Sequence, residues 1–369
     1  MTGQRRGVAL TPMETRRDVI VRAAALADEL GYELFAVPEG WGLDSTPVLA
    51  EIAMHTARIK LASGVLSVWG RTPATLAMTA ATLDQISGGR YVLGLGASTR
   101  ALAEGFHDTP FEHPAQKLRD VVTEVRTLLA GQPARLHHAP AVPPLRLGQP
   151  PVPDIPIWVA ALGQHTTQVA AELGDGWIPA LVARDRLPSW AARLTRLRQA
   201  AAPHARPLTV AAGPLAVADE DPATARNITA ACTAWYLSAM GDLYARSLAG
   251  QGYAAEVRAI LDVNSRPSPR HGSVPAAAQV ILDQLAVYGT GDQVREPLQP
   301  WDHAADNVVI LLPPGTPWHN IEATLLAAAP SARPALASHR RQRRAATGDS
   351  PPVPRVQHYQ VGESRWQEG

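Results

Sequence analysis

Short apolar segments rich in β-branched residues alternate with helical patterns along most of this 369-residue chain. Such alternation is typical of an α/β fold in which crossover helices join parallel strands. Eight strands are predicted, at residues 7–11, 33–37, 59–68, 90–96, 155–161, 175–181, 207–217 and 308–313. Eight strand–helix units in one domain of this length predict a (β/α)8 TIM barrel, with a doubly wound sheet as the second choice.

A long helical section separates the last two predicted strands and covers residues 227–248, 252–261 and 274–290. We therefore expect a helical insertion before the last strand, at about residues 218–275, within a barrel domain that spans 1–330. Segment 133–154 contains too much proline for a regular element and predicts a loop. The tail at 331–369 is polar and rich in Arg and Pro, which predicts disorder.

Charge and cysteine content narrow the classes of function. The formal net charge is +1, so we expect neither nucleic acid nor a membrane surface as a partner. No segment is apolar over the length that a bilayer requires. Cys232 is the single cysteine, which excludes a disulfide framework and fits a cytoplasmic protein. His107 and His113 lack the spacing and the third ligand of a zinc site, so no metal is expected.

A glycine pair ends the fourth predicted strand, in the stretch ISGGRYVLGLGAST. A dinucleotide fingerprint needs a third glycine, and Thr99 stands at that position, so this fingerprint is absent. Gly94 and Gly96 would let a flat ring approach bare backbone, or they would only ease packing at a barrel corner. Gly64, inside the third predicted strand, indicates a bulge or a similarly close backbone approach.

The segment 160–167, AALGQHTT, follows a strand and opens a helix. Free backbone N–H groups around Gly163 to His165 would face an anion at the helix N-terminus. The alternative is an ordinary capped helix with no ligand.

Two long segments, 61–98 and 155–177, resemble in this order the bacterial luciferase-like oxidoreductase superfamily. The chain is most similar to the branch that uses coenzyme F420, the methylenetetrahydromethanopterin reductase-like proteins. The resemblance implies a barrel that binds a deazaflavin at the carboxyl ends of its strands, with FMN as the alternative cofactor. It also implies a cis peptide in a bulged third strand, at Gly64 and Val65, behind the ring. Gly96 and Ala97 would lie beside the ring, and the phosphate would bind at Leu162, Gly163, Gln164 and His165.

The sequence departs from the superfamily where proton transfer would be expected. In alcohol-oxidising relatives the second strand ends in an Asp-His pair, whereas this chain has Glu39 followed by Gly40. Thr99 stands where an acid would follow the glycine pair. Oxidation of an alcohol needs a base at the hydroxyl, so the resemblance favours a reductase. Glu39 and Thr99 are the catalytic candidates, although a carboxylate such as Glu39 also commonly orders the next loop.

Four side chains are candidates for the substrate wall. Three follow predicted strand ends, and the fourth lies in the predicted insertion: Trp41, Trp69, Arg71 and Tyr236. The expected substrate is a secondary metabolite or a modified peptide that is reduced at a C=C or C=N bond. Two other functions remain open, a monooxygenase that uses reduced FMN and a non-catalytic binding protein. The resemblance also implies a homodimer formed through barrel helices.

Overall fold

The computed structural model describes residues 4–136 and 141–330, and the predicted tail lies outside the described residues. Strand β11 pairs in parallel with β8 and with β1, which closes the sheet and confirms the (β/α)8 barrel over a doubly wound sheet. The strands are β1 Arg6–Leu10, β2 Leu34–Val37, β3 Lys60–Ser63, β4 Leu66–Ser67, β5 Tyr91–Gly96, β6 Ile157–Ala160, β7 Gly176–Ile178, β8 Thr209–Ala212, β9 Leu215–Ala218, β10 Ala286–Gly289 and β11 Asn307–Leu312.

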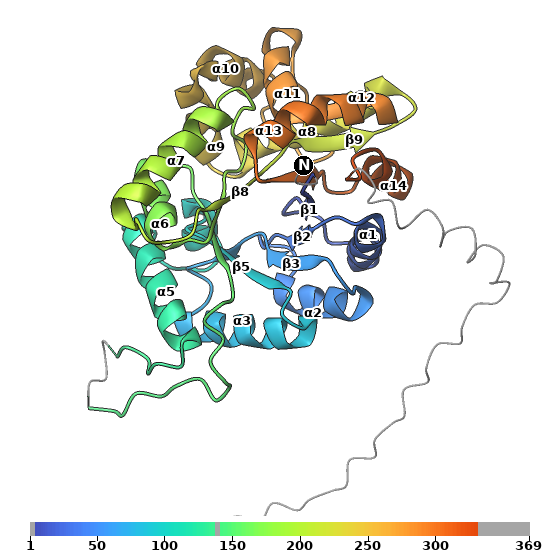
Figure 1. Cartoon of the computed structure of the whole chain (residues 1–369). Coiled ribbons are helices and arrows are strands. Elements are labelled where there is room, and N and C mark those ends of the chain that lie inside the picture. Colours follow the sequence, from blue (N-terminus) through green and yellow to red (C-terminus); the bar gives the residue numbers. More distant parts are fainter. Residues whose placement is uncertain (1–3, 137–140, 331–369) are drawn as a thin grey trace, which may run out of the picture. The chain divides into compact units, whose positions relative to one another are not determined.

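Helices surround the strands, and those between β9 and β11 gather at the top of Figure 1. The helices are α1 Arg17–Leu30, α2 Ser45–His55, α3 Pro73–Ser87, α4 Arg100–Gly105, α5 Pro114–Leu129, α6 Gln164–Leu173, α7 Leu187–Ala201, α8 Pro222–Ala239, α9 Leu243–Leu248, α10 Ala254–Val263, α11 Gln279–Leu285, α12 Gly291–Arg295, α13 Gln299–Ala304 and α14 Trp318–Ala327. Short helical turns η1 Ala249–Tyr253, η2 Ala276–Ala278 and η3 Glu296–Leu298 connect some of them.

Alternation along the strands divides the core into two layers. On β2, Leu34 and Ala36 belong to a small cluster inside the barrel, together with one side chain from most other strands. Phe35 and Val37 on the same strand point outward into the large cluster between strands and helices. Strands buried on both faces explain why the predicted strand segments are apolar almost throughout.

Three predicted elements differ from the structure. The strand predicted at 207–217 is split into β8 and β9 at Gly213, where the backbone passes so close to β11 that a Cβ would lie 2.1 Å from the Val309 carbonyl oxygen. The helix predicted at 274–290 is wrong in its last turn, where Ala286–Gly289 forms β10 in parallel with β9. The helical section predicted at 227–248 is helical in the structure, but it consists of two helices, α8 and α9, that are separated at Gly241, where φ is 76°.

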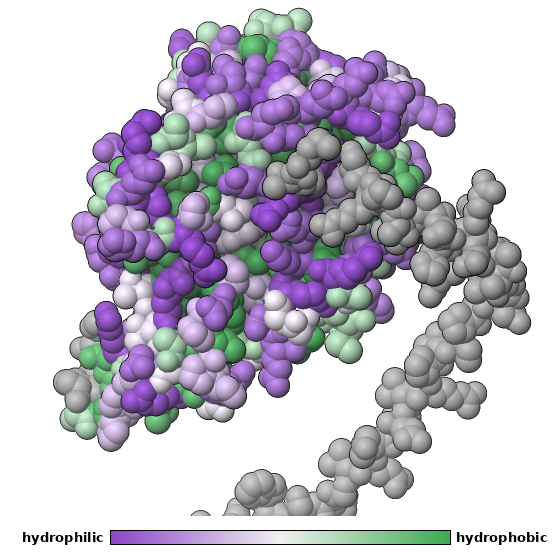
Figure 2. Space-filling view, viewed as in Figure 1, coloured by the Kyte–Doolittle hydropathy of each residue, from purple (hydrophilic) through white to green (hydrophobic). Residues whose placement is uncertain are grey.

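The helices of the insertion expose mainly hydrophilic side chains in the upper part of Figure 2. Among residues 4–136 and 141–330, no helix combines the length and the apolar character needed to cross a bilayer. The same residues contain no group of three or more His, Cys, Asp or Glu side chains placed to hold a metal ion.

Candidate active site

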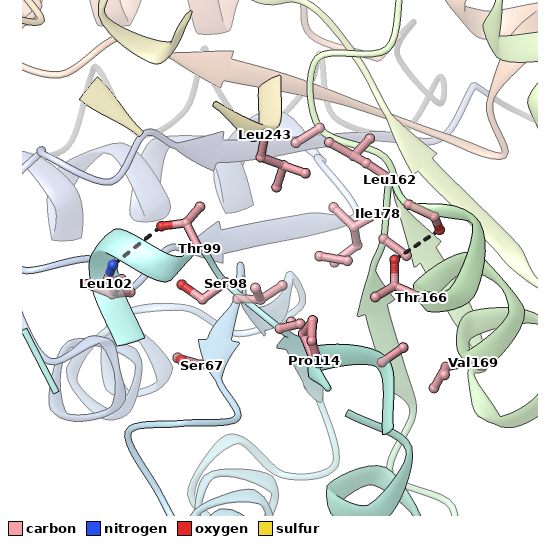
Figure 3. Close-up of a pocket in the computed structure, with 18 of the residues that line it drawn as sticks. Ser67, Ser98, Thr99, Leu102, Pro114, Leu162, Thr166, Val169, Ile178 and Leu243 are labelled. Atoms are coloured by element: carbon pink, nitrogen blue, oxygen red, sulfur yellow. Dashed lines mark hydrogen bonds between the residues drawn. The ribbon is translucent and has the colours of Figure 1, made fainter. Parts of the chain in front are cut away.

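A cavity of about 710 Å³ opens at the carboxyl ends of the barrel strands, which is the face where barrel active sites lie. Four of the predicted ring contacts line it, namely Gly64, Val65, Gly96 and Ala97. The start of α6 forms one side, at the right of Figure 3, and Pro114 at the start of α5 lies below. Leu243 closes it from the insertion. The cavity is within the range of volumes typical of small-molecule and cofactor sites.

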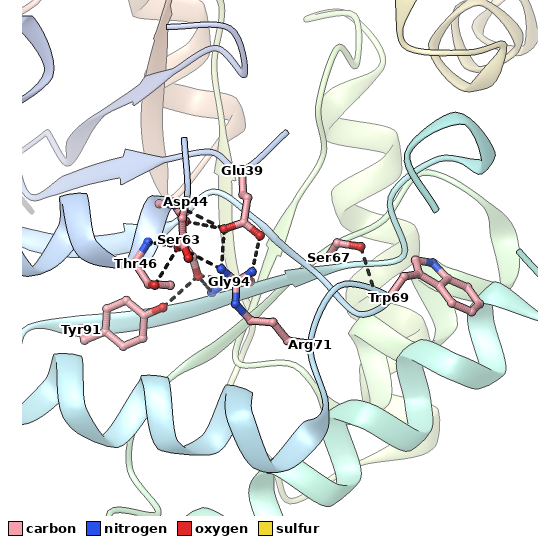
Figure 4. A network of polar contacts seen from close by, with 10 residues as sticks. Glu39, Asp44, Thr46, Ser63, Ser67, Trp69, Arg71, Tyr91 and Gly94 are labelled. Carbon is pink, nitrogen blue, oxygen red and sulfur yellow. Dashed lines mark hydrogen bonds and ion pairs between the residues drawn. The ribbon is translucent and has the colours of Figure 1, made fainter. Parts of the chain in front are cut away.

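The third barrel strand is interrupted between β3 and β4, and the Gly64–Val65 peptide there is cis, as the resemblance predicted. The Ser63 hydroxyl fixes this bulge, because it donates to the Gly94 carbonyl oxygen at 3.0 Å and accepts from the Gly94 N–H at 2.8 Å. The Tyr91 hydroxyl donates to Ser63 at 3.1 Å. These residues lie together in Figure 4.

The two glycines of the fourth predicted strand serve different purposes. A Cβ on Gly94 would lie 1.9 Å from the Ser63 carbonyl oxygen, so Gly94 makes room for the neighbouring strand rather than for a ring. Gly96 lines the cavity, and a Cβ there would lie 2.8 Å from Cγ2 of Val65. Gly96 therefore has two roles open to it, because it makes room for Val65 and also lines the cavity, whereas close packing alone explains Gly94.

The N-terminus of α6 faces the cavity. Gly163 is its N-cap, no side chain caps it, and the Thr166 hydroxyl turns back to the Gly163 carbonyl oxygen at 3.0 Å. Gly163, Gln164 and His165 all line the cavity, as does Leu162 before them. A ten-residue helix with uncapped N–H groups at its first turn suits a phosphate, because the helix dipole and the free donors both favour an anion.

Glu39 lines the cavity but is held in a partly buried ion pair. Its carboxylate accepts from both terminal nitrogens of Arg71, one of them at 2.8 Å, and also from the N–H of Ser45 at 3.3 Å. Arg71 also binds Asp44 at 2.9 Å (Figure 4). Hydrogen bonding to Glu39 raises the pKa of Arg71 despite its burial. This arrangement orders the loop after β2, and it turns Arg71 toward Glu39 instead of into the cavity.

Thr99 also lines the cavity, and it is the N-cap of α4. Its hydroxyl accepts from the Leu102 N–H at 3.4 Å, the contact drawn in Figure 3. The oxygen of Thr99 therefore already has a structural role.

The predicted substrate wall lies elsewhere in the structure. Trp41, Trp69, Arg71 and Tyr236 do not line the cavity. Trp69 packs against Phe111, and its indole N–H donates to the Ala97 carbonyl oxygen at 2.7 Å. Trp41 is 39% exposed and contacts Trp235, whose other neighbour is the buried Tyr236.

Met240, Leu243 and Tyr244 line the cavity from the insertion instead. Their place at the cavity does not follow from the helical section predicted at 227–248, because α8 ends at Ala239 and a turn redirects the chain before α9. The Gly-Asp pair at 241–242 is the signal in the sequence that marks this turn.

The fold is a (β/α)8 barrel whose cavity lies at the carboxyl ends of the strands and is bordered by the N-terminus of α6. The family model of the luciferase-like monooxygenases matches residues 1–305, and the chain belongs to this family. A Mycobacterium tuberculosis protein named as a coenzyme F420-dependent oxidoreductase is 28% identical over 321 residues, which cover 78% of this chain and 88% of that protein.

A second relative is the 5,10-methylenetetrahydromethanopterin reductase of Archaeoglobus fulgidus, which is 33% identical over 153 residues. That match covers 41% of this chain and 46% of the reductase. Among solved structures, the coenzyme F420-dependent tetrahydromethanopterin reductase of Methanopyrus kandleri superposes with a TM-score of 0.70 at 21% identity, over 89% of this chain and 98% of that chain. The structural likeness confirms the fold.

Proposed function

We propose that this chain is a coenzyme F420-dependent reductase that adds hydride to a polarised C=C or C=N bond of a secondary metabolite or a modified peptide. One observation carries the proposal: the cavity combines bare backbone at Gly64 and Gly96 with the uncapped N-terminus of α6. A planar ring needs backbone without side chains, and a phosphate needs free N–H donors. The relatives named for coenzyme F420 support the deazaflavin over FMN.

In this proposal the residues of the chain bind and orient the coenzyme. Gly64 and Val65 back the ring, Gly96 and Ala97 lie beside it, and the phosphate binds at Leu162, Gly163, Gln164 and His165. When bound, the reduced coenzyme supplies the hydride. Leu243 and its neighbours on the insertion then enclose the substrate.

The side chains around the cavity favour reduction over oxidation of an alcohol. Oxidation needs a base within reach of the substrate hydroxyl. Glu39 is paired with Arg71, Gly40 has no side chain, and the Thr99 oxygen caps a helix. Reduction needs no such base, because the substrate gains a hydride and a proton.

We also propose a cytoplasmic homodimer that binds a small-molecule or peptide substrate. The outer faces of the neighbouring helices α2 and α3 expose Met54, Met78 and Ile86, with exposed fractions of 75%, 56% and 42%. Exposed apolar side chains that gather on adjacent helices are typical of subunit interfaces. Cys232 is buried as a free thiol, which fits a reducing compartment.

The test supplies purified protein with reduced coenzyme F420, without oxygen, and with two probes: a cyclic enone bearing a methyl group on its α carbon, and a cyclic imine. The proposal expects the absorbance of the oxidised coenzyme to return only when a probe is present. A parallel assay in air supplies reduced FMN, and oxygen uptake there, with no reaction of the deazaflavin, would establish the monooxygenase instead. Coenzyme binding without turnover of either probe would make the protein a non-catalytic member of the family.

A further inference from the structure

The insertion places a tyrosine at the cavity that is not among the site residues predicted from the sequence. Tyr244 lies in the first turn of α9 and lines the cavity with Met240 and Leu243. Figure 3 shows Leu243, the residue before it, on the insertion side of the cavity with Thr99 and Leu162 flanking it. Tyr244 therefore belongs to the wall that the insertion contributes, and the ring-binding backbone belongs to the strand ends.

The turn before α9 brings this tyrosine to the end of β5. Gly241 has a φ of 76°, and a Cβ built on it would lie 3.9 Å from the Cβ of Thr99. Tyr244 follows three residues later. The insertion thus meets the barrel at Thr99, the position where an acid was expected from the resemblance and is missing.

Packing orients the Tyr244 ring and leaves its hydroxyl free. The ring meets Tyr236 edge to face at 5.4 Å between centroids, and Tyr236 meets Trp235 in the same way at 5.1 Å. Within residues 4–136 and 141–330, the Tyr244 hydroxyl has no hydrogen-bond partner. A phenol held by its ring, with its O–H unused, is suited to meet a polar atom of a ligand.

Other acidic or hydroxyl groups at the cavity are less suited to donate a proton. Arg71 engages both oxygens of Glu39, and the Ser67 hydroxyl accepts from the Trp69 N–H. Ser98 has a free hydroxyl, but an aliphatic alcohol is a weaker acid than a phenol. His165 lies at the start of α6, where we place the phosphate of the coenzyme, and His113 is the N-cap of α5.

We propose that Tyr244 donates the proton that completes the reduction, an inference that rests on the proposed function. Hydride adds to one carbon of the double bond, and the electron pair of the broken π bond moves to the other atom. The Tyr244 O–H bond breaks and its proton bonds to that atom, which leaves a phenolate. The phenolate then takes a proton from water in the cavity. Burial raises the pKa of Tyr244 to about 12, so the phenol carries its proton at neutral pH.

The test compares Tyr244→Phe with Tyr253→Phe, a matched change in the same insertion. The Tyr253 hydroxyl donates to Asp185 at 3.0 Å, and Tyr253 does not line the cavity. Each variant is examined for coenzyme F420 affinity by fluorescence, for thermal unfolding, and for reduction of the methylated cyclic enone. The handedness of the ketone product is measured as well, because protonation of its α carbon creates a stereocentre.

We expect Tyr244→Phe to keep its coenzyme affinity within about threefold and to lower kcat by a hundredfold or more, the usual range for a general acid. The product should also lose its handedness, because water then protonates both faces. Tyr253→Phe should match the unmodified chain. Unchanged kcat and handedness in Tyr244→Phe would overturn the role of Tyr244 and leave the reductase standing. Failure of the unmodified chain to reduce either probe would overturn both.

Discussion

Replacing Ser63 by alanine tests whether the bulge after β3 shapes the backbone that receives the ring. Ser63 is fully buried, and its hydroxyl contacts Gly94 through both the N–H and the carbonyl oxygen. The same hydroxyl accepts from Tyr91 at 3.1 Å. Alanine removes all of these contacts and leaves the Gly94 N–H without this acceptor in a dry environment.

The expected loss follows from these contacts. A typical hydrogen bond contributes about 1 kcal/mol net, and a buried donor without an acceptor costs about 1–3 kcal/mol. Ser63→Ala should therefore lower the free energy of unfolding by roughly 3 kcal/mol. Tyr91→Phe removes one of the contacts and should cost about 1 kcal/mol. Because the two hydroxyls touch, the double variant should cost less than the sum of the single changes.

The assay is urea unfolding of the protein without coenzyme, together with fluorescence titration of coenzyme F420. Ser63→Ala should weaken coenzyme binding roughly tenfold, which corresponds to about 1.4 kcal/mol. Ser87→Ala is the matched control, because Ser87 is also buried but lies at the end of α3, outside the bulge between β3 and β4. It should lose stability and keep coenzyme affinity. Unchanged stability in Ser63→Ala, or reduced stability with unchanged affinity, would refute the reasoning.

Three further predictions follow from single contacts. Gly96→Ala places a Cβ 2.8 Å from Cγ2 of Val65, so coenzyme affinity should fall roughly tenfold in the same titration; an unchanged affinity would contradict the ring placement. Burial alone would raise the pKa of Glu14, but hydrogen bonds from Arg16 and the backbone lower it below 4.5. The ionised Glu14 carboxylate therefore stabilises the fold fully above about pH 4.5, and this stabilisation is lost as the pH falls through the lowered pKa. The difference in free energy of unfolding between the unmodified chain and Glu14→Gln should therefore shrink in acid, and a constant difference would contradict this. Met78→Glu should yield monomers in light scattering, and a persistent dimer would exclude the α2–α3 face.

Patterns of apolar residues predicted most of the barrel, because strands buried on both faces are apolar throughout and helices have an apolar face. The same reasoning failed for β10, whose four residues directly follow a helix and become a strand only by pairing with β9. So short an apolar run fits a helix or a strand equally well until its partner is known.

Two backbone features predicted for the site are confirmed. The cis peptide at Gly64 lies where the family resemblance implied it, and the helix start at Gly163 lies where the sequence pattern predicted it. The side chains of the substrate wall were harder to predict, because the direction of the Arg71 side chain depends on its ion pair with Glu39. Tyr244 reaches the cavity only because the turn at Gly241 interrupts a helix, a tertiary effect that periodicity does not reveal.

The most direct test of the central claim is a side-by-side titration of the purified chain with coenzyme F420 and with FMN, followed by fluorescence. We predict saturable binding of coenzyme F420 and at least tenfold weaker binding of FMN. We also predict that Gly96→Ala weakens coenzyme F420 binding, because Gly96 lines the proposed ring site. Tight binding of FMN without measurable binding of coenzyme F420 would contradict the account.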